Sequence, residues 1–300
     1  MSYRPLGVML ALAGLLPAAV AHAELPPQLR TMLDAAIASG NDGDIDTLAR
    51  YLKKASPDDA PEIDHIITDH RKQIAVAKQE KLAHQGVLEG WKGEGQIGAS
   101  QSSGNTSTVG ATVGINLSKE GLRWRHKLNA SIDYERTAGI TDRNQILGGL
   151  ESDYKFSDRL FAYGSAQYER NRFAGFDTRV SVSGGIGYRV VAAPTFTLDL
   201  KAGPAWRKTD YIGEPSASEI TGMTALDALW KATPNLTLSE NATSLSGSSN
   251  TNLTSLTALS LKVSKALSTR ISYQVTFNSN PPEGYKTTDT LTRFTLVYGF

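Results

Sequence analysis

The chain has 300 residues, a hydrophobic content of 40% and a formal net charge of +1 at pH 7. This near-neutral charge excludes a strongly basic nucleic-acid-binding surface and an acidic disordered tail, so no nucleic-acid partner is predicted. Because the chain has no cysteine, disulfides and an acylated N-terminal cysteine are excluded as well.

Residues 1–23 have the pattern of a secretory signal peptide. Arg4 precedes an apolar run over residues 6–20, and Ala21-His22-Ala23 forms a cleavage motif of small residues. The run is shorter than the roughly 20 residues that a membrane-spanning helix needs. We therefore expect export across the inner membrane, with a mature chain that begins near Glu24.

Residues 24–86 predict a small α-helical extension in the periplasm. Apolar residues recur at helical spacing after Asn41 and again over residues 62–84, which indicates two or three short helices. The histidines of this region, His65, His70 and His84, lack the spacing of a metal-ligand cluster. We predict no metal and no cofactor.

At residue 87 the hydrophobic period changes from 3.6 to 2. In residues 122–135 apolar side chains alternate with charged and polar ones over the whole length. Similar segments lie near 91–100, 108–117, 144–156, 160–169, 179–190, 196–206, 219–231, 236–245, 252–263, 267–277 and 290–300. A lipid-facing side and a polar lumen account for this alternation. The sequence therefore predicts an all-β transmembrane antiparallel β-barrel of about twelve strands over residues 87–300.

The predicted connections differ in length between the two ends of the barrel. Short turns are expected at 118–121, 157–159, 192–194, 233–235 and 264–266, and longer loops at 136–143, 170–178, 207–218 and 278–289. Bacterial barrels place short turns in the periplasm and longer loops outside the cell. This ordering predicts an outer-membrane barrel with both chain ends on the periplasmic side.

The last strand ends in aromatic residues at alternate positions. Phe294, Tyr298 and Phe300 share one face of this strand, an ending that is typical of bacterial outer-membrane barrels. We predict that these residues form the signal read by the outer-membrane insertion machinery. The two expected partners are thus this machinery and the lipid bilayer of the outer membrane.

The polar faces of the strands supply charges of both signs to the lumen. The lumen-lining candidates are Arg123, Arg125, Lys127, Asp133, Glu135, Glu151, Asp153, Arg189, Asp199, Arg270 and Arg293. Hairpin geometry places Arg125 and Lys127 opposite Asp153 and Glu151, and Arg189 opposite Asp199. Such pairs either brace a filled interior or line a weakly selective channel for small ions or solutes. In an open lumen the five arginines predict modest anion selectivity.

A membrane-embedded hydrolase that acts on lipid or envelope polymer is the enzymatic alternative. A serine nucleophile needs a base, and the predicted barrel contains one histidine, His126, on the lipid-facing side of its strand. Its neighbours Trp124 and Leu128 favour a structural role at the membrane interface. We therefore predict no catalytic residues.

Three segments of the barrel resemble a known family. They are Gly93-Glu94-Gly95-Gln96-Ile97-Gly98-Ala99 with Ser102-Ser103-Gly104-Asn105-Thr106, Tyr168–Asp177, and Asp289-Thr290-Leu291-Thr292 with Leu296-Val297-Tyr298-Gly299-Phe300. They are similar to the salt-induced outer-membrane protein family, a domain of unknown function, and the resemblance covers about residues 88–300. It implies a barrel in the outer membrane and a link to salt or osmotic stress. A narrow pore or a structural envelope protein is the predicted function.

Overall fold

A computed structural model describes residues 25–103, 109–137, 140–248, 250–281 and 283–300. For residues 135–137, 140–144 and 173 it describes the backbone alone. The predicted signal peptide, residues 1–23, lies outside the described residues. The chain divides into two compact units, with the division between Lys81 and Leu82.

The first unit consists of three α-helices, α1 (Pro27–Ser39), α2 (Asp42–Ala55) and α3 (Ala60–Ala83), with a short 3-10 turn, η1 (Pro57–Asp59), before α3. Asn41 caps α2, because its side chain accepts a hydrogen bond from the Gly43 amide at 3.0 Å. Leu33, Ile45 and Ile63 are almost fully buried and form the centre of a small apolar core. No described helix is both long enough and apolar enough to cross a membrane.

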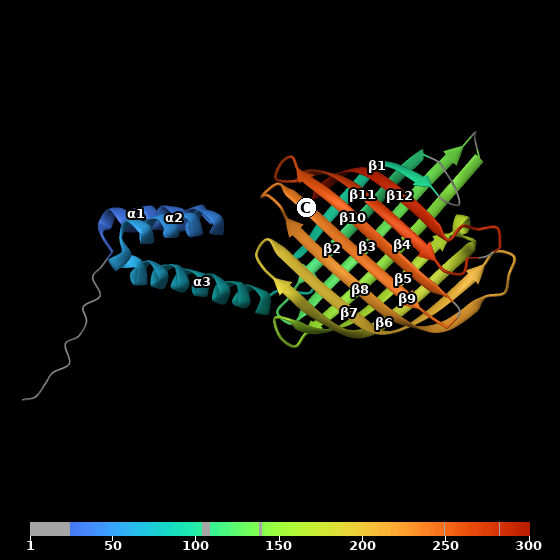
Figure 1. The fold of residues 1–300 in the computed structure, drawn as a ribbon, viewed down its shortest axis with the longest axis horizontal. Helices are drawn as coiled ribbons and strands as arrows, with labels where there is room; N and C mark the ends of the chain where they lie inside the picture. The colour runs from blue at the N-terminus through green and yellow to red at the C-terminus, as the bar shows by residue number, and fades with distance from the viewer. Residues whose placement is uncertain (1–24, 104–108, 138–139, 249, 282) are drawn as a thin grey trace, which may run out of the picture. The chain divides into compact units, whose positions relative to one another are not determined.

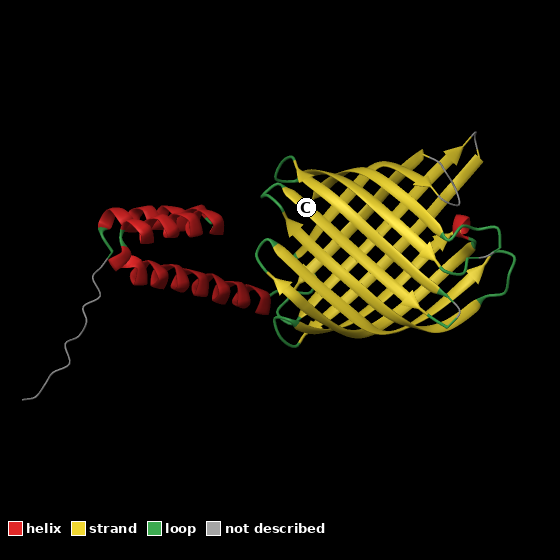
Figure 2. Cartoon of the chain, viewed as in Figure 1, coloured by secondary structure: helices red, strands yellow, loops and turns green. Residues whose placement is uncertain are grey.

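The second unit is a closed antiparallel barrel of twelve strands among the described residues (Figures 1 and 2). The strands are β1 (Trp91–Ser103), β2 (Val109–Glu120), β3 (Trp124–Thr137), β4 (Ile140–Lys155), β5 (Leu160–Asn171), β6 (Phe176–Ala192), β7 (Phe196–Tyr211), β8 (Ala217–Lys231), β9 (Leu236–Ser246), β10 (Thr251–Lys262), β11 (Leu267–Asn278) and β12 (Thr288–Gly299). A one-turn 3-10 helix, η2 (Arg172–Ala174), joins β5 to β6. Near and far walls cross in Figure 2, as the strand tilt of a closed barrel requires. The predicted fold is confirmed.

The barrel exposes its apolar side chains and buries its charges. Ile97, Val113 and Ile132 point outward and are 60%, 56% and 49% exposed, whereas the carboxylates of Asp133 and Asp153 are 1% and 0% exposed. In water this distribution would be unfavourable, because apolar surface would be hydrated and charges removed from solvent. In a bilayer it is favourable, so the outward face of the barrel is the lipid-facing side of a transmembrane barrel.

The first and last strands close the barrel. β1 pairs with β12 from Glu94 opposite Gly299 to Ser103 opposite Thr290. The ladder continues past β12, since the amides of Gly93 and Phe300 each donate to the other's carbonyl oxygen at 2.9 Å. Gly93 leaves room for the Phe300 ring, because a Cβ at this position would lie 2.2 Å from it unless the ring moved. We call the end of the barrel where β1 begins and β12 ends the terminal end, and the opposite end the distal end.

Several strands extend further toward the distal end than predicted. The connections expected at 170–178 and 207–218 are reduced to 172–175 and 212–216, because β5, β6, β7 and β8 are longer, and β3 and β4 likewise extend to Thr137 and from Ile140 into the loop expected at 136–143. The apolar alternation stops at residue 206, but the backbone ladder continues through Arg179 opposite Thr209. The predicted contrast in loop length was therefore wrong for these connections. Apolar residues at every second position indicate where a strand contacts lipid, whereas a strand can continue beyond the lipid wherever its backbone has a hydrogen-bonded neighbour.

We expect residues 87–300 expressed without the helical unit to form the complete barrel, because every strand pairs within that range. The fragment should migrate differently in SDS gels before and after boiling, as the full chain should. A fragment whose boiled and unboiled samples migrate identically, beside a heat-modifiable full chain, would contradict this expectation.

Candidate functional site

The most concentrated group of polar contacts lies inside the barrel toward the terminal end. Arg125 Nε donates to Asp153 Oδ2 at 2.6 Å, and its Nη1 donates to Asp199 Oδ2 at 3.3 Å. Arg189 contacts the same carboxylate with two nitrogens, at 2.7 and 2.8 Å. Two guanidinium groups therefore share Asp199, and the contact from Arg125 on β3 to Asp199 on β7 crosses the lumen.

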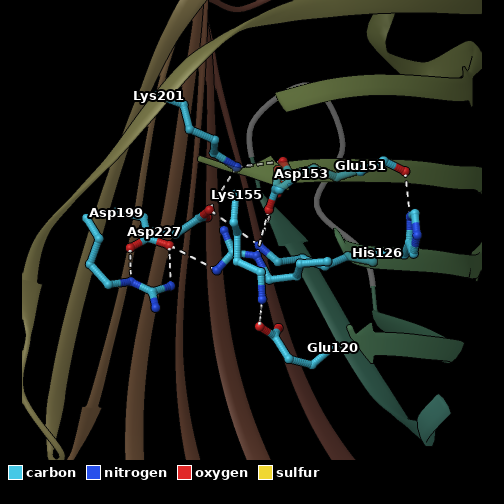
Figure 3. Close-up of polar contacts among 12 residues, drawn as sticks. Glu120, His126, Glu151, Asp153, Lys155, Asp199, Lys201 and Asp227 are labelled. Carbon is cyan, nitrogen blue, oxygen red and sulfur yellow. Dashed lines mark hydrogen bonds and ion pairs between the residues drawn. The ribbon is translucent and has the colours of Figure 1, made fainter. Parts of the chain in front are cut away.

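Two lysines extend this group. Lys127 Nζ lies 3.1 Å from Glu151 and 3.6 Å from Asp227, and Lys201 Nζ lies 2.5 Å from Glu151 and 2.8 Å from Asp227. Figure 3 shows part of this arrangement. We call the eight residues the charge lattice: Arg125, Lys127, Glu151, Asp153, Arg189, Asp199, Lys201 and Asp227. Four positive and four negative side chains make the lattice neutral.

The lattice packs against aromatic rings inside the lumen. The guanidinium of Arg125 lies 5.1 Å from the centre of the Phe161 ring, and Lys201 Nζ lies 5.9 Å from that of Tyr163. Phe161 and Tyr163 are 4% exposed and form a small apolar cluster with Met223 and neighbouring alanines. The interior along β5 to β8 is thus partly filled by apolar side chains, which the sequence analysis did not predict.

Further ion pairs line the rest of the lumen. Arg293 holds Asp133 with two nitrogens at 2.8 and 2.7 Å, and Arg270 donates to Glu94 at 2.8 Å. Two more pairs are Arg207 with Glu219 and Arg179 with Glu169. Each of these four arginines faces a carboxylate, so this part of the lumen also balances its charges.

Sequence reasoning found the pairs within hairpins and missed those across the lumen. The predicted pairs Arg125–Asp153, Lys127–Glu151 and Arg189–Asp199 are all present. The contacts of Lys201 with Glu151 and of Arg293 with Asp133 join strands that are not neighbours. No spacing in the sequence signals them, because they depend on the width and register of the closed barrel.

Two predicted lumen residues, Arg123 and Glu135, are not seen to line the lumen. Arg123 does not line the lumen: it precedes β3 and donates to the Tyr154 hydroxyl at 3.0 Å, and Tyr154 pairs with the outward-facing Trp124. The prediction was wrong because the side chain extends toward the outward-facing Tyr154, although the Arg123 carbonyl oxygen still accepts from the Lys155 amide at 2.7 Å. Glu135 lies in β3 opposite Gly110, but its side chain is not among the described ones.

Polar cavities remain beside the lattice. A cavity of about 310 Å³ is lined by Gln96, Asn116, Asn129, Asn241, Ser272 and other residues, mostly on the walls opposite the lattice. A second cavity, of about 160 Å³, adjoins Lys201 and Glu151 and shares Asn129 with the first. Asn129 and Asn241 are exposed although they point inward. The lumen therefore contains polar space between the lattice and the remaining wall.

His126 lies on the outward face near the terminal end. Its Nδ1 is 2.9 Å from Ser152 Oγ, and its ring stacks on Trp124 with 5.9 Å between ring centres. Among the described contacts, no carboxylate approaches the imidazole. Within the part of the chain that the structure describes, no group of three acidic, histidine or cysteine side chains could hold a metal ion.

A family model described as protein of unknown function, DUF481, matches residues 95–300, and the chain belongs to this family. The predicted membership in a family of unknown function is confirmed. The uncharacterized protein YdiY of Escherichia coli (strain K12) is 25% identical over 213 residues, which cover 68% of this chain and 82% of YdiY.

Solved barrel structures are similar to this chain at low sequence identity. The NanC porin has 10% identity and a TM-score of 0.48 over 68% of this chain and 98% of its own. The translocator domain of autotransporter NalP from Neisseria meningitidis has 13% identity and a TM-score of 0.44, and the match covers 79% of this chain and 96% of that domain. An outer membrane channel from Pseudomonas putida F1 has 8% identity and a TM-score of 0.44, and the match covers 72% of this chain and 98% of that channel.

We expect Asp199→Asn to destabilise the barrel, because the guanidinium groups of Arg125 and Arg189 then lose the negative charge that they share inside the lumen. The free energy of unfolding should fall by about 3 kcal/mol, which is typical when one partner of a buried ion pair is removed. The temperature at which the barrel loses its heat-modifiable migration measures this loss.

The control variant Glu120→Gln breaks the more exposed Lys155–Glu120 pair, in which Glu120 is 52% exposed. It should change the free energy of unfolding by less than about 1 kcal/mol. Equal effects of the two variants would show that the lattice does not stabilise the barrel.

Proposed function

We propose that this member of the DUF481 family is an outer-membrane barrel with a narrow pore for water and small uncharged polar solutes. The proposal rests on the observation that one side of the lumen is filled by side chains whereas the other side contains a polar cavity. The charge lattice and aromatic rings fill the side formed by β3 to β8, and a cavity lined mainly by amides and hydroxyls, together with the carboxylate-paired Arg270 and Arg293, lies toward the other side. A barrel that is merely filled would have no need of inward-facing asparagines in open space.

The chemistry of the open side favours uncharged solutes. Asn116, Asn129 and Asn241 offer both hydrogen-bond donors and acceptors, and hydroxyl groups such as that of Ser272 lie between them. Such groups replace part of the hydration shell of a polyol or of water at little cost. An ion would have to pass near fixed charges that already have partners.

The charge pairing changes the expected selectivity. The sequence predicts modest anion selectivity if five arginines act on an open lumen, but Arg123 lies outside it, and Arg125, Arg189, Arg270 and Arg293 each contact a carboxylate. A matched pair produces only a weak field at a distance. We therefore propose that the pore discriminates weakly between small anions and cations.

The outer membrane is the proposed location. The lipid-facing apolar band, the aromatic residues of the last strand and the export signal expected at residues 1–23 support it. Phe294 and Tyr298 are 55% and 59% exposed on the outward face, where an insertion machinery can contact them. We place the terminal end and the helical unit of residues 24–86 in the periplasm. A pore that passes water and small solutes is also consistent with the link to salt or osmotic stress implied by the family resemblance.

A lipid hydrolase is the weaker candidate, although His126 lies at hydrogen-bond distance from Ser152. The described contacts of His126 include no carboxylate that would orient the imidazole, as acyl-transfer sites require. Ser152 lies within the β4 ladder, where it pairs with His126 and Gly164, and ladder amides are not free to stabilise an oxyanion. We therefore propose a non-enzymatic barrel.

We expect the purified full-length protein to conduct weakly in planar bilayers and to show a small reversal potential in a KCl gradient, because the lattice is neutral. Two double variants with matched geometry test this. Arg125→Gln with Arg189→Gln leaves uncompensated carboxylates and should shift selectivity toward cations. Asp153→Asn with Asp199→Asn should shift it toward anions.

Swelling of proteoliposomes in a small polyol gives a second readout that does not depend on ions. Wild-type protein that neither conducts at any voltage nor admits the polyol would reject the pore and leave a structural barrel as the better account. Opposite variants that shift the reversal potential in the same direction would contradict the role of the lattice.

Orientation can be tested with single cysteines, since the native chain has none. Glu214 lies in the distal connection 212–216, and Asp158 lies in the terminal turn between β4 and β5. We expect Glu214→Cys to react with a membrane-impermeant maleimide on intact cells. Asp158→Cys should react only after the outer membrane is permeabilised, and the reverse pattern would invert the proposed orientation.

A further inference from the structure

The outward face of β9 carries an acidic residue. Glu240 lies one outward position beyond Leu238, and its neighbours in the ladder are Ala228 on β8 and Thr257 on β10. These positions belong to the lipid-facing side, because the lumen-facing Asn241 follows Glu240 on the opposite face. An ionisable side chain on this side is costly unless another group compensates it.

Two hydroxyl groups of β10 hold the carboxylate. Ser255 Oγ donates to Glu240 Oε1 and Thr257 Oγ1 donates to Glu240 Oε2, each at 2.5 Å. Both oxygens therefore act as acceptors, which is the arrangement expected of a carboxylate. No lysine, arginine or histidine among the described residues forms an ion pair with Glu240. The charge is oriented by these hydroxyls but not neutralised.

A groove on the outer surface runs past this carboxylate. It has a volume of about 360 Å³ and is lined by Phe196, Ala228, Trp230, Leu238 and Glu240. Phe196, Trp230 and Leu238 form one row across β7, β8 and β9, and Ala228 leaves space in the next row beside Glu240. Trp230 is 49% exposed, so its ring faces the lipid.

Aromatic rings beside a carboxylate are the usual environment for an alkylammonium group. The ring faces attract the cation, and the carboxylate neutralises it and accepts its hydrogen bonds. Tryptophan at a barrel end marks the level of the lipid headgroups, and Glu240 lies one outward position inside that level. A lipid with an amine headgroup can therefore bring its cation to Glu240 while an acyl chain follows the groove.

We propose that Glu240, Trp230 and Phe196 form a binding site for a phospholipid with a primary ammonium headgroup. A primary amine is favoured over a trimethylated one because it donates hydrogen bonds to the carboxylate oxygens. An anionic headgroup would be repelled by Glu240. A second copy of the chain is disfavoured, because a two-fold contact would bring two like carboxylates together. The site goes beyond the proposed pore and does not depend on it.

Native mass spectrometry of the full-length protein in detergent tests the site. Protein is mixed with equal amounts of phosphatidylethanolamine and phosphatidylglycerol that carry the same acyl chains, and the bound adducts are counted. We expect wild type to retain the ethanolamine lipid preferentially. Glu240→Gln, which keeps the shape and removes the charge, should lower this preference roughly tenfold, in line with the loss of a partly desolvated cation contact.

Two further variants make the result specific. Ala228→Leu fills the floor of the groove and should also lower retention, whereas Glu120→Gln removes the same charge at the terminal end outside the groove and should leave the preference unchanged. Equal retention of the two lipids by wild type, or an unchanged preference in Glu240→Gln, would overturn the proposal. A wild-type dimer that dissociates in Ala228→Leu but persists in Glu240→Gln would assign the face to a second copy and overturn the proposal.

Discussion

The need to satisfy every backbone hydrogen bond within the bilayer governs this structure. A hydrocarbon core offers no water to the edge of a sheet, so a sheet can cross it only if the first strand meets the last. Here β1 pairs with β12 along almost its whole length, and Gly93 and Phe300 continue the ladder at the terminal end. Closure then separates all remaining positions into an inside and an outside.

Closure also explains why the charges take the form of a lattice. Alternation delivers lysines, arginines and carboxylates to an interior from which much of the water is excluded, and an isolated charge there would be unfavourable. Lys201 between Glu151 and Asp227, and Asp199 between two arginines, show how the charges are compensated. Because these contacts join β3 and β4 to β7 and β8, they hold non-neighbouring strands together and leave the polar cavities toward the other side.

The lumen-facing and lipid-facing sides of the barrel wall have different proposed roles. Inside, amides and hydroxyls such as those of Asn129 and Ser272 face the cavities that we assign to small uncharged solutes. Outside, Glu240 lies beside Trp230 and Phe196 in a groove open to lipid. One strand contributes to both, because Glu240 and Asn241 are consecutive in β9 and point to opposite sides.

The sequence by itself determined the elements whose signal is local. A period of two with apolar residues on one face placed the strands, and hairpin neighbours such as Arg189 and Asp199 could be paired because a tight turn sets their register. Only the tertiary structure decided the contacts across the lumen, the aromatic cluster of Phe161 and Tyr163, and the exclusion of Arg123 from the lumen. Those features depend on how wide the barrel is and how its strands are staggered, and both follow from closing the whole sheet rather than from any one segment.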